Sequence, residues 1–360
     1  MRILIVNPFG IGDVLFTTPM IAELKEQYPG AYIGYVCNAR AKDILLNNPK
    51  VDKVFIYEKD QFRNLSKHSR LLAFRKLLKF LRSIRRGKFD IAFDLSLGQE
   101  YGFFLRLIGI RKRIGYNYRR RGKFLTDKIA LEGYDTKHMV DYYLDLLPLI
   151  GIEPKQKNIE FPVSPADNAW AADFAAEHAV KPGDILVGIA PGGGASWGRD
   201  AYRKQWPAQR FAALANEITA RFGARIVLLG DGSETALCNQ VASLIRSEPI
   251  IACGRTTVSR YAALLKLCRL IICNDGGPLH LAVSQGVRTI SIFGPVDPAV
   301  YGPYPPGAGN VVIRKGLDCQ PCYHRFKLKA CSHGRCLSDL EMREIMGAAE
   351  SFLGGEVGGA

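Results

Sequence analysis

The sequence has no apolar run that approaches the roughly 20 residues a membrane-spanning helix requires. Its first residues, MRILIVNPFGIGD, contain neither a long apolar segment nor a small-residue cleavage site, so they do not predict a signal peptide. Acidic residues are also scarce, because 34 Asp and Glu stand against 49 Lys and Arg, a formal net charge of +15. These absences predict a cytoplasmic protein with an anionic partner: nucleic acid, an acidic membrane surface or a phosphorylated substrate.

Two basic segments in the first half of the chain contain no acid at all. The segment 63–88 holds ten Lys and Arg, and the segment 111–123 holds seven. A solvated surface is one interpretation of such clusters. Because both lie in one half of the chain, we favour a surface that meets an anion, with Arg63 and Arg120 as candidate contacts.

Apolar residues within the first basic segment have helical spacing. Leu71, Phe74, Leu78 and Leu81 form one stripe of a helix expected over about 67–86. Such a helix could lie on a membrane surface. We expect instead that the stripe packs on a sheet and that the basic face is exposed.

The nine cysteines fall into two groups. Five lie apart in apolar surroundings and are predicted core residues: Cys37, Cys238, Cys253, Cys268 and Cys273. Four are grouped as C-x2-C-x8-C-x4-C: Cys319, Cys322, Cys331 and Cys336. Four thiols at such intervals can bind zinc or an iron–sulfur cluster. Because the pattern lacks the two CxxC pairs that are typical of such metal sites, we favour a packed or redox-active thiol cluster and predict no metal site.

Short apolar strands alternate with helical patterns along the whole chain. The predicted strands are RILIVN, AYIGYVCN, KVFIY, FDIAFDLS and KRIGYN in the first half, then DILVGIAPGGG, ARIVLLGDG, PIIACG, LIICNDGG and RTISIFGP. Between them, 151–185 is rich in Pro and polar residues, which is typical of a linker. The pattern predicts an α/β protein with two doubly wound parallel sheets, divided as 1–165 and 166–345, with a final helix over 338–353.

The loop GIGDV after the first strand resembles a dinucleotide-binding loop but departs from it. Gly10 and Gly12 fit the fingerprint, yet the third glycine and the later acid are missing. Asp13 would also repel a pyrophosphate at that helix N-terminus. Two interpretations of Asp13 remain: it caps the helix, or it is a general base beside a substrate hydroxyl.

Three glycine-containing turns follow strands in the second half. Gly192, Gly193 and Gly194 allow a close backbone approach, and Gly276 and Gly277 open a helix whose N–H groups can face an anion. The third turn is LLGDGSE, which ends at Glu234. Four polar residues accompany these turns: Lys204, Glu234, Asp275 and His280. Three of them have an ordinary structural interpretation: Lys204 as a surface lysine, Glu234 as a residue in a helix's first turn and His280 as a packed histidine. Together they favour a nucleotide-diphosphate site.

In combination and order, these segments resemble glycosyltransferase family 9, the heptosyltransferases of lipopolysaccharide core synthesis. The resemblance rests on GIGDVLFTTPMIAELKEQYPGAYIGYVC, NNPKVDKVF, KFDIAFDL, RKRIGY, HMVDYYLDLLPLIGI, KQWP, NDGGPLHLAVSQGV and FGPVDP. It implies a GT-B fold with an acceptor-binding N-terminal domain and a donor-binding C-terminal domain facing a cleft. It also implies inverting transfer without metal or cofactor, from a nucleotide-sugar such as ADP-heptose to a lipid-linked saccharide at the inner membrane face.

The resemblance also assigns roles to individual residues. Asp13 is implied as the base that deprotonates the acceptor and Lys204 as the cation on the donor phosphates, while Glu234 is similar to the acid that holds the ribose. The implied phosphate-side turn is Gly192 and Gly193, and the implied donor loop is Asp275, Gly276, Gly277 and His280. Gly276 departs from the Ser or Thr often found there, which removes a hydroxyl contact.

Two rival hypotheses stay open at this point. The first keeps the glycosyltransferase but changes the donor to another nucleotide-hexose. The second is a basic protein without catalysis that binds lipid or nucleic acid. We expect no nucleic-acid partner, because the basic clusters lack the interleaved aromatics that stack on single-stranded bases.

Overall fold

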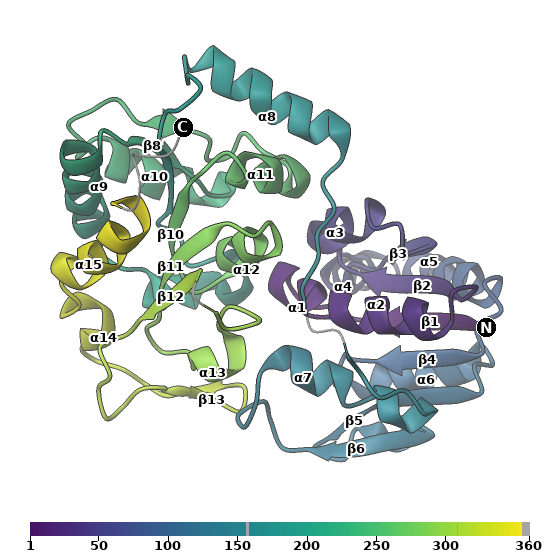
Figure 1. Ribbon diagram of the computed structural model, residues 1–360. Helices are drawn as coiled ribbons and strands as arrows, with labels where there is room; N and C mark the ends of the chain where they lie inside the picture. Colours follow the sequence, from purple (N-terminus) through teal and green to yellow (C-terminus); the bar gives the residue numbers. More distant parts are fainter. Residues whose placement is uncertain (156–157, 308, 355–360) are drawn as a thin grey trace. The chain divides into compact units, whose positions relative to one another are not determined.

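The computed structural model describes residues 1–155, 158–307 and 309–354 (Figure 1). The chain forms two compact units, Met1–Ile159 and Glu160–Ala360. Each unit contains a parallel sheet of its own with helices around it, as the strand–helix alternation predicted. In the described residues, no helix combines the length and the apolar character needed to cross a bilayer.

The sheet of the first unit has the order β3-β2-β1-β4-β5-β6. Its strands are β1 (Arg2–Val6), β2 (Tyr32–Cys37), β3 (Lys53–Ile56), β4 (Ile91–Asp94), β5 (Lys112–Tyr118) and β6 (Asp127–Leu131), and all neighbours are parallel. From β1 to β3 the strands are added toward one edge of the sheet, and from β4 to β6 toward the other. The direction of strand succession therefore reverses between β1 and β4. In open α/β sheets, ligands bind beyond the carboxyl ends of the strands at such a reversal, so this edge is where a site is expected.

Helices cover both faces of this sheet because its strands are apolar on both sides. They are α1 (Ile11–Leu15), α2 (Thr18–Gln27), α3 (Lys42–Leu46), α4 (Lys59–His68), α5 (Arg70–Arg85), α6 (Gln99–Leu107) and α7 (Met139–Leu144), with 3-10 turns η1 (Ala39–Ala41), η2 (Gly122–Phe124) and η3 (Leu147–Ile150). Leu4 and Val6 pack against Ile84 of α5 and Leu105 of α6. Side chains alternate along a strand, so Ile3 and Ile5 face the opposite layer.

The expectation that the apolar stripe of 67–86 packs on the sheet is wrong for its first half. Only the end of α5 is anchored, where Leu81 and Ile84 are buried, while Leu71 and Phe74 are exposed. The helical segment is also broken at Ser69, which ends α4 and begins α5 in an extended conformation. The hydroxyl of Ser69 accepts the Leu72 N–H at 3.3 Å, an N-terminal cap that favours a new helix here.

The sheet of the second unit has the order β12-β11-β10-β7-β8-β9, which repeats the succession of the first. Its strands are β7 (Leu186–Ala190), β8 (Arg225–Leu228), β9 (Ile250–Ile251), β10 (Leu270–Asn274), β11 (Arg288–Ile292) and β12 (Asn310–Ile313). The reversal lies between β7 and β10. A short antiparallel pair, β13 (Tyr323–His324) and β14 (Lys327–Leu328), follows.

The helices of the second unit include one within the expected linker. They are α8 (Pro165–Glu177), α9 (Ala208–Phe222), α10 (Thr235–Ala242), α11 (Val258–Leu265), α12 (Gly277–Ser284), α13 (Pro298–Tyr301), α14 (Arg335–Ser338) and α15 (Met342–Leu353), with the 3-10 segments η4 (Ala195–Lys204) and η5 (Gly232–Glu234). The linker interpretation of 151–185 missed α8. Ser164 caps this helix through the Asp167 N–H at 3.1 Å, and Pro165 occupies its first position, where proline is favourable.

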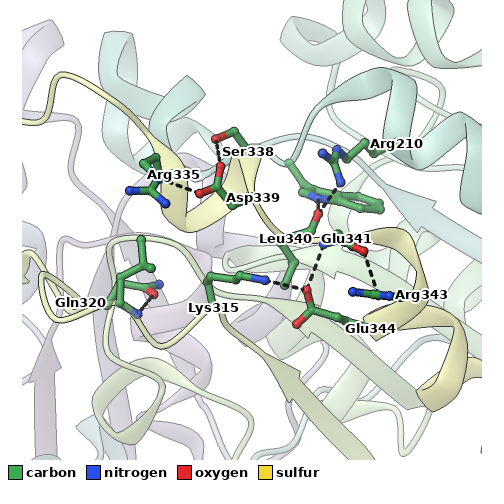
Figure 2. Close-up of polar contacts among 12 residues, drawn as sticks. Arg210, Lys315, Gln320, Arg335, Ser338, Asp339, Leu340, Glu341, Arg343 and Glu344 are labelled. Carbon is green, nitrogen blue, oxygen red and sulfur yellow. Dashed lines mark hydrogen bonds and ion pairs between the residues drawn. The ribbon is translucent and has the colours of Figure 1, made fainter.

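The junction before α15 fixes the segment that follows η4. The Leu340 carbonyl accepts hydrogen bonds from Arg210 Nη1 at 2.8 Å and from Trp206 Nε1 at 3.1 Å (Figure 2). Lys315 and Glu344 form an ion pair at 3.2 Å beside it. The indole of Trp206 is buried, so the chain two residues after Lys204 is held rigidly.

Candidate functional site

In the first unit, Asp13 is the third residue of helix α1. Its Oδ2 accepts the Gly10 N–H at 3.1 Å, so the capping interpretation describes a real contact. A carboxylate has two oxygens and about four lone-pair sites, so this contact leaves capacity for a proton or another donor. The side chain is half-buried. Capping and base chemistry are therefore compatible at this position.

Asn7 supports this loop from the end of β1, a role that sequence reasoning missed. Its Nδ2 donates to the Asp13 carbonyl at 3.1 Å, and its Oδ1 accepts the Phe9 N–H at 3.1 Å. Asn7 is fully buried, which makes both hydrogen bonds costly to lose. A polar residue that directly follows a buried strand was the available signal.

Buried tyrosines lie within electrostatic range of the Asp13 carboxylate. Burial raises the pKa of Tyr134 and of Tyr143 well above its ordinary value, and the negative charge of Asp13 adds to both shifts. The region around Asp13 thus has low polarity on its inner side. A charge in such surroundings interacts more strongly with a nearby proton donor than it would in water.

A second carboxyl group lies on the strand next to β1. Asp94 ends β4 and accepts Ser96 Oγ at 2.6 Å and the Ser96 N–H at 3.1 Å. Burial raises its pKa to about 6 despite these bonds. Asp94 and Arg121 line a recess together with Leu97, Gly98, Gly102, Tyr116, Phe124 and Leu125. In the sequence, the only signal for this recess is that Asp94 stands at the end of a strand.

The candidate anion contacts of the first unit lie on separate elements. Arg63 lies on α4 and pairs with Asp60 at 3.0 Å, whereas Arg120 follows β5 with a left-handed backbone, φ +62°. Arg119 shares this conformation at φ +47°, which is unusual for a residue with a side chain. The structure does not bring Arg63 and Arg120 into contact in the part of the chain it describes. Gly12 lies within α1, next to Asp13.

In the second unit, Lys204 and Asp275 form a buried ion pair. Lys204 Nζ lies 2.7 Å from Asp275 Oδ2, and their side chains are 5% and 6% exposed. The same Nζ lies 5.1 Å above the ring of Trp197. Lys204 is thus not a solvated surface lysine, which was its ordinary structural interpretation.

Glu234 is enclosed by the turn after β7. Its Oε1 accepts the Gly194 N–H at 3.2 Å and its Oε2 accepts the Asp231 N–H at 3.1 Å. A Cβ atom on Gly192 would lie 1.7 Å from Glu234 Oε1, so a larger residue there would force the Glu234 carboxylate to move. Burial raises the pKa of Glu234 above its ordinary value.

Asn274, at the end of β10, ties these turns together. Its Nδ2 donates to the carbonyls of Pro191 and Gly192 at 2.8 and 3.0 Å, and its Oδ1 accepts the Trp206 N–H at 3.1 Å. A Cβ atom on Gly276 would lie 3.9 Å from the Gly193 carbonyl oxygen. The turns after β7 and β10 therefore meet at the strand reversal.

The predicted second-unit residues thus converge at one edge of one sheet. The residues joined by contact or close approach are Gly192, Gly193, Lys204, Glu234, Asp275 and Gly276. Gly277 is the first residue of α12, and His280 is buried one turn later. Sequence reasoning missed Asn274, although it directly precedes Asp275.

The four grouped cysteines differ in their exposure. Cys319 and Cys331 are exposed, Cys322 is half-buried and Cys336 is buried. The N–H of Gly334 donates to Cys331 Sγ at 3.3 Å, and this bond lowers the pKa of the Cys331 thiol. Within the described ranges, no three His, Cys, Asp or Glu side chains are arranged to hold a metal ion. The five other cysteines are buried, which confirms their prediction as core residues.

Solved structures with the same architecture define the class. The chain is similar to a glycosyltransferase family 9 protein from Veillonella parvula, with TM-score 0.83, 25% identity and coverage of 99% of this chain and 98% of that one. It also matches E. coli ADP-heptose LPS heptosyltransferase II, with TM-score 0.76, 21% identity and 98% of both chains covered. The two-sheet fold is that of the GT-B glycosyltransferases, as the resemblance implied.

The particular family follows from the sequence match. The model of glycosyltransferase family 9 (heptosyltransferase) matches residues 77–333, and the chain belongs to this family. A lipooligosaccharide heptosyltransferase 2 from Campylobacter jejuni is 25% identical over 364 aligned positions, which cover 98% of each chain. The protein is therefore a glycosyltransferase.

Proposed function

We propose that this enzyme transfers a heptose from ADP-heptose to the inner core of lipopolysaccharide or a related lipid-linked saccharide, with inversion and without a metal ion. The similarity to heptosyltransferases from Campylobacter and E. coli supports the sugar and the acceptor class. In this proposal, residues 1–165 bind the acceptor and residues 166–345 bind the donor. The observation that carries it is the buried Lys204–Asp275 pair among glycine turns at a strand reversal.

The proposed donor site uses Lys204 without breaking its ion pair. An ammonium group has three N–H donors, so Nζ can bind Asp275 and a phosphate oxygen together. The turns at Gly192–Gly193 and Gly276–Gly277 let backbone N–H groups approach the diphosphate, and His280 completes this loop. Glu234 accepts ribose hydroxyls with its remaining lone pairs. These donors stabilise the charge that grows on the leaving diphosphate.

The proposed reaction is a single displacement. Asp13 takes the proton of the acceptor hydroxyl. At the same time, the oxygen of that hydroxyl attacks the anomeric carbon from the face opposite the donor diphosphate. The bond from that carbon to the phosphate oxygen breaks, its electron pair leaves on ADP, and the configuration inverts. General-base catalysis of this kind contributes about 100- to 10,000-fold to the rate.

The proposed acceptor explains the basic first unit. An inner-core saccharide carries acidic groups at the cytoplasmic face of the membrane, and Arg63, Arg120 and the N–H of Gly12 are proposed to contact it. Both arginines are exposed and belong to acid-free basic segments. In this proposal, the enzyme works in the cytoplasm at the inner membrane face and has no nucleic-acid partner.

Two measurements test the proposal. Purified protein is incubated with ADP-heptose and candidate core acceptors, and mass spectrometry should find an acceptor heavier by one heptose. Thermal shift with ADP, UDP and GDP should give the largest stabilisation with ADP. A larger shift with UDP or GDP, together with transfer of a hexose, would overturn the heptose donor.

The catalytic base is tested with Asp13→Asn. Asn keeps an oxygen that can accept the Gly10 N–H, so the fold and the ADP affinity should be unchanged while turnover falls at least 100-fold. Asp43→Asn, an acid in the first turn of the neighbouring helix α3, is the matched control and should retain activity. Wild-type turnover in Asp13→Asn would reduce Asp13 to a helix cap.

A further inference from the structure

An apolar group of three residues is exposed at the start of α5. The side chains of Leu71, Leu72 and Phe74 belong to residues that are 64%, 53% and 57% exposed. They follow the break at Ser69 directly, in the first turns of the helix. Contiguous exposed apolar groups of this kind usually mark a surface that meets a protein or a membrane.

The α4–α5 pair is held together by other residues, so this group is not needed for its packing. Tyr57 stacks on Phe62 with ring centroids 4.8 Å apart, and it contacts Phe80 at 5.1 Å. At the far end of α5, Leu81 and Ile84 are buried. The aromatic contacts and the buried end anchor the pair to the sheet, and the turn at Ser69 projects the apolar group outward.

The surroundings of the group are uniformly basic. Arg70 is one helical turn before Phe74, and Arg75 is one turn after Leu71, so both border the group on the helix surface. All ten Lys and Arg of 63–88 are exposed. Within the described part of the chain, Arg63 alone among them has an ion pair, with Asp60 of the same helix. The remaining charges are therefore available to an anionic partner.

We propose that the α4–α5 pair docks on an anionic lipid bilayer, with Leu71, Leu72 and Phe74 inserted at the headgroup boundary. The flanking arginines and lysines contact lipid phosphates while their methylene chains lie along the apolar group. A bilayer surface offers both the apolar layer and the negative charge that this face requires. Two copies of the chain would bring like charges together, and a nucleic-acid backbone offers no apolar layer. The inference deepens the proposed function, because a lipid-linked acceptor is presented at such a surface.

Vesicle co-sedimentation of the full chain tests this docking. The wild type should bind vesicles of phosphatidylcholine with phosphatidylglycerol, with affinity that falls as salt rises, and should bind pure phosphatidylcholine at least tenfold more weakly. Leu71→Ser/Leu72→Ser/Phe74→Ser should reduce binding to anionic vesicles at least tenfold. Leu46→Ser/Leu107→Ser, which removes equally exposed leucines from α3 and α6, is the matched control and should bind like the wild type.

Insertion is tested separately by fluorescence. Phe74→Trp should shift its emission to shorter wavelength on anionic vesicles and be quenched by brominated lipid, whereas Leu107→Trp should show neither change. Equal vesicle binding by the triple serine variant and the wild type would overturn the proposal, as would equal wild-type binding to neutral vesicles. A wild-type dimer that the serine variant dissolves would assign the face to a second copy and overturn it too.

Failure of the proposed reaction can be distinguished from failure of the docking surface. Transfer to a delipidated, water-soluble acceptor should be unaffected in the triple serine variant, while transfer to acceptor in anionic vesicles should fall at least tenfold. If the wild type binds anionic vesicles but transfers no heptose to any acceptor, the docking surface stands and the proposed reaction fails.

Discussion

Lys204 Nζ and Asp275 Oδ2 lie 2.7 Å apart, in side chains that are almost completely buried. The two residues are 71 positions apart in sequence, and they meet because β7 and β10 are neighbours at the strand reversal of the second unit. Burying two charges costs free energy because both lose their water. Removing one partner costs more, because the other charge is then buried without a partner. It is therefore a sensitive place to test the structure.

Asp275→Asn and Lys204→Met should each lower the free energy of unfolding of the second unit by about 3 to 5 kcal/mol, because each leaves one buried charge without a partner. The combined Lys204→Met/Asp275→Leu variant should recover most of this loss. Urea unfolding followed by tryptophan fluorescence reports on this unit alone, since Trp170, Trp197 and Trp206 all lie in it. Asp339→Asn, which removes an exposed pair with Arg335, is the control and should leave the unfolding curve unchanged.

Gly192→Ala should weaken ADP binding about tenfold or more, because the new Cβ atom would displace the Glu234 carboxylate. Gly232→Ala is the control: it lies in the same turn as Glu234, with no atom within 4 Å of the added Cβ. Titration calorimetry with ADP compares the two variants. If Gly192→Ala binds ADP as tightly as the wild type, Glu234 does not contact the nucleotide.

We predict that the stability of the first unit depends on pH through Asp94. Its pKa is raised from 3.8 to about 6 by burial, so between these pH values the folded state binds more protons than the unfolded state. Stability should therefore fall as pH rises from about 4 to about 6. At pH 7 the full cost of the buried charge is on the order of 3 kcal/mol.

Asp94→Asn removes this charge and keeps an oxygen for the Ser96 hydrogen bonds. Calorimetry should find the variant more stable than the wild type at pH 7 and similar to it at pH 4. Asp60→Asn, at an exposed acid of α4, should show no such difference. A variant less stable than the wild type at pH 7 would mean that Asp94 is held by a cation or donor that compensates its burial.

The sequence was sufficient to predict the strands that are buried on both sides, and with them both sheets. It missed β6 and β12, the last strands at one edge of each sheet, where residues are half-exposed and the apolar signal is weak. It also missed α8, because the Pro-rich and polar composition of 151–185 indicated a linker, although a proline such as Pro165 suits the first position of a helix.

The site was predictable where a glycine turn follows a strand, since strand order brings such turns to one edge. The residues that hold the turns were not. Asn7 and Asn274 act through hydrogen bonds to the backbone of other segments, and no local pattern reveals those partners. The exposure of Leu71 and Phe74 was missed for a related reason: helical spacing identifies a stripe, but the break at Ser69 decides which part of it reaches the sheet.

Both sheets follow one succession of strands, and each reverses once. Each half of the chain thus has a strand reversal of its own, with an asparagine that holds the neighbouring turn. If the halves recognise different substrates, then either specificity can change by mutation without disturbing the other. Exchanging residues 160–354 between relatives should carry the nucleotide preference along and leave the choice of saccharide behind.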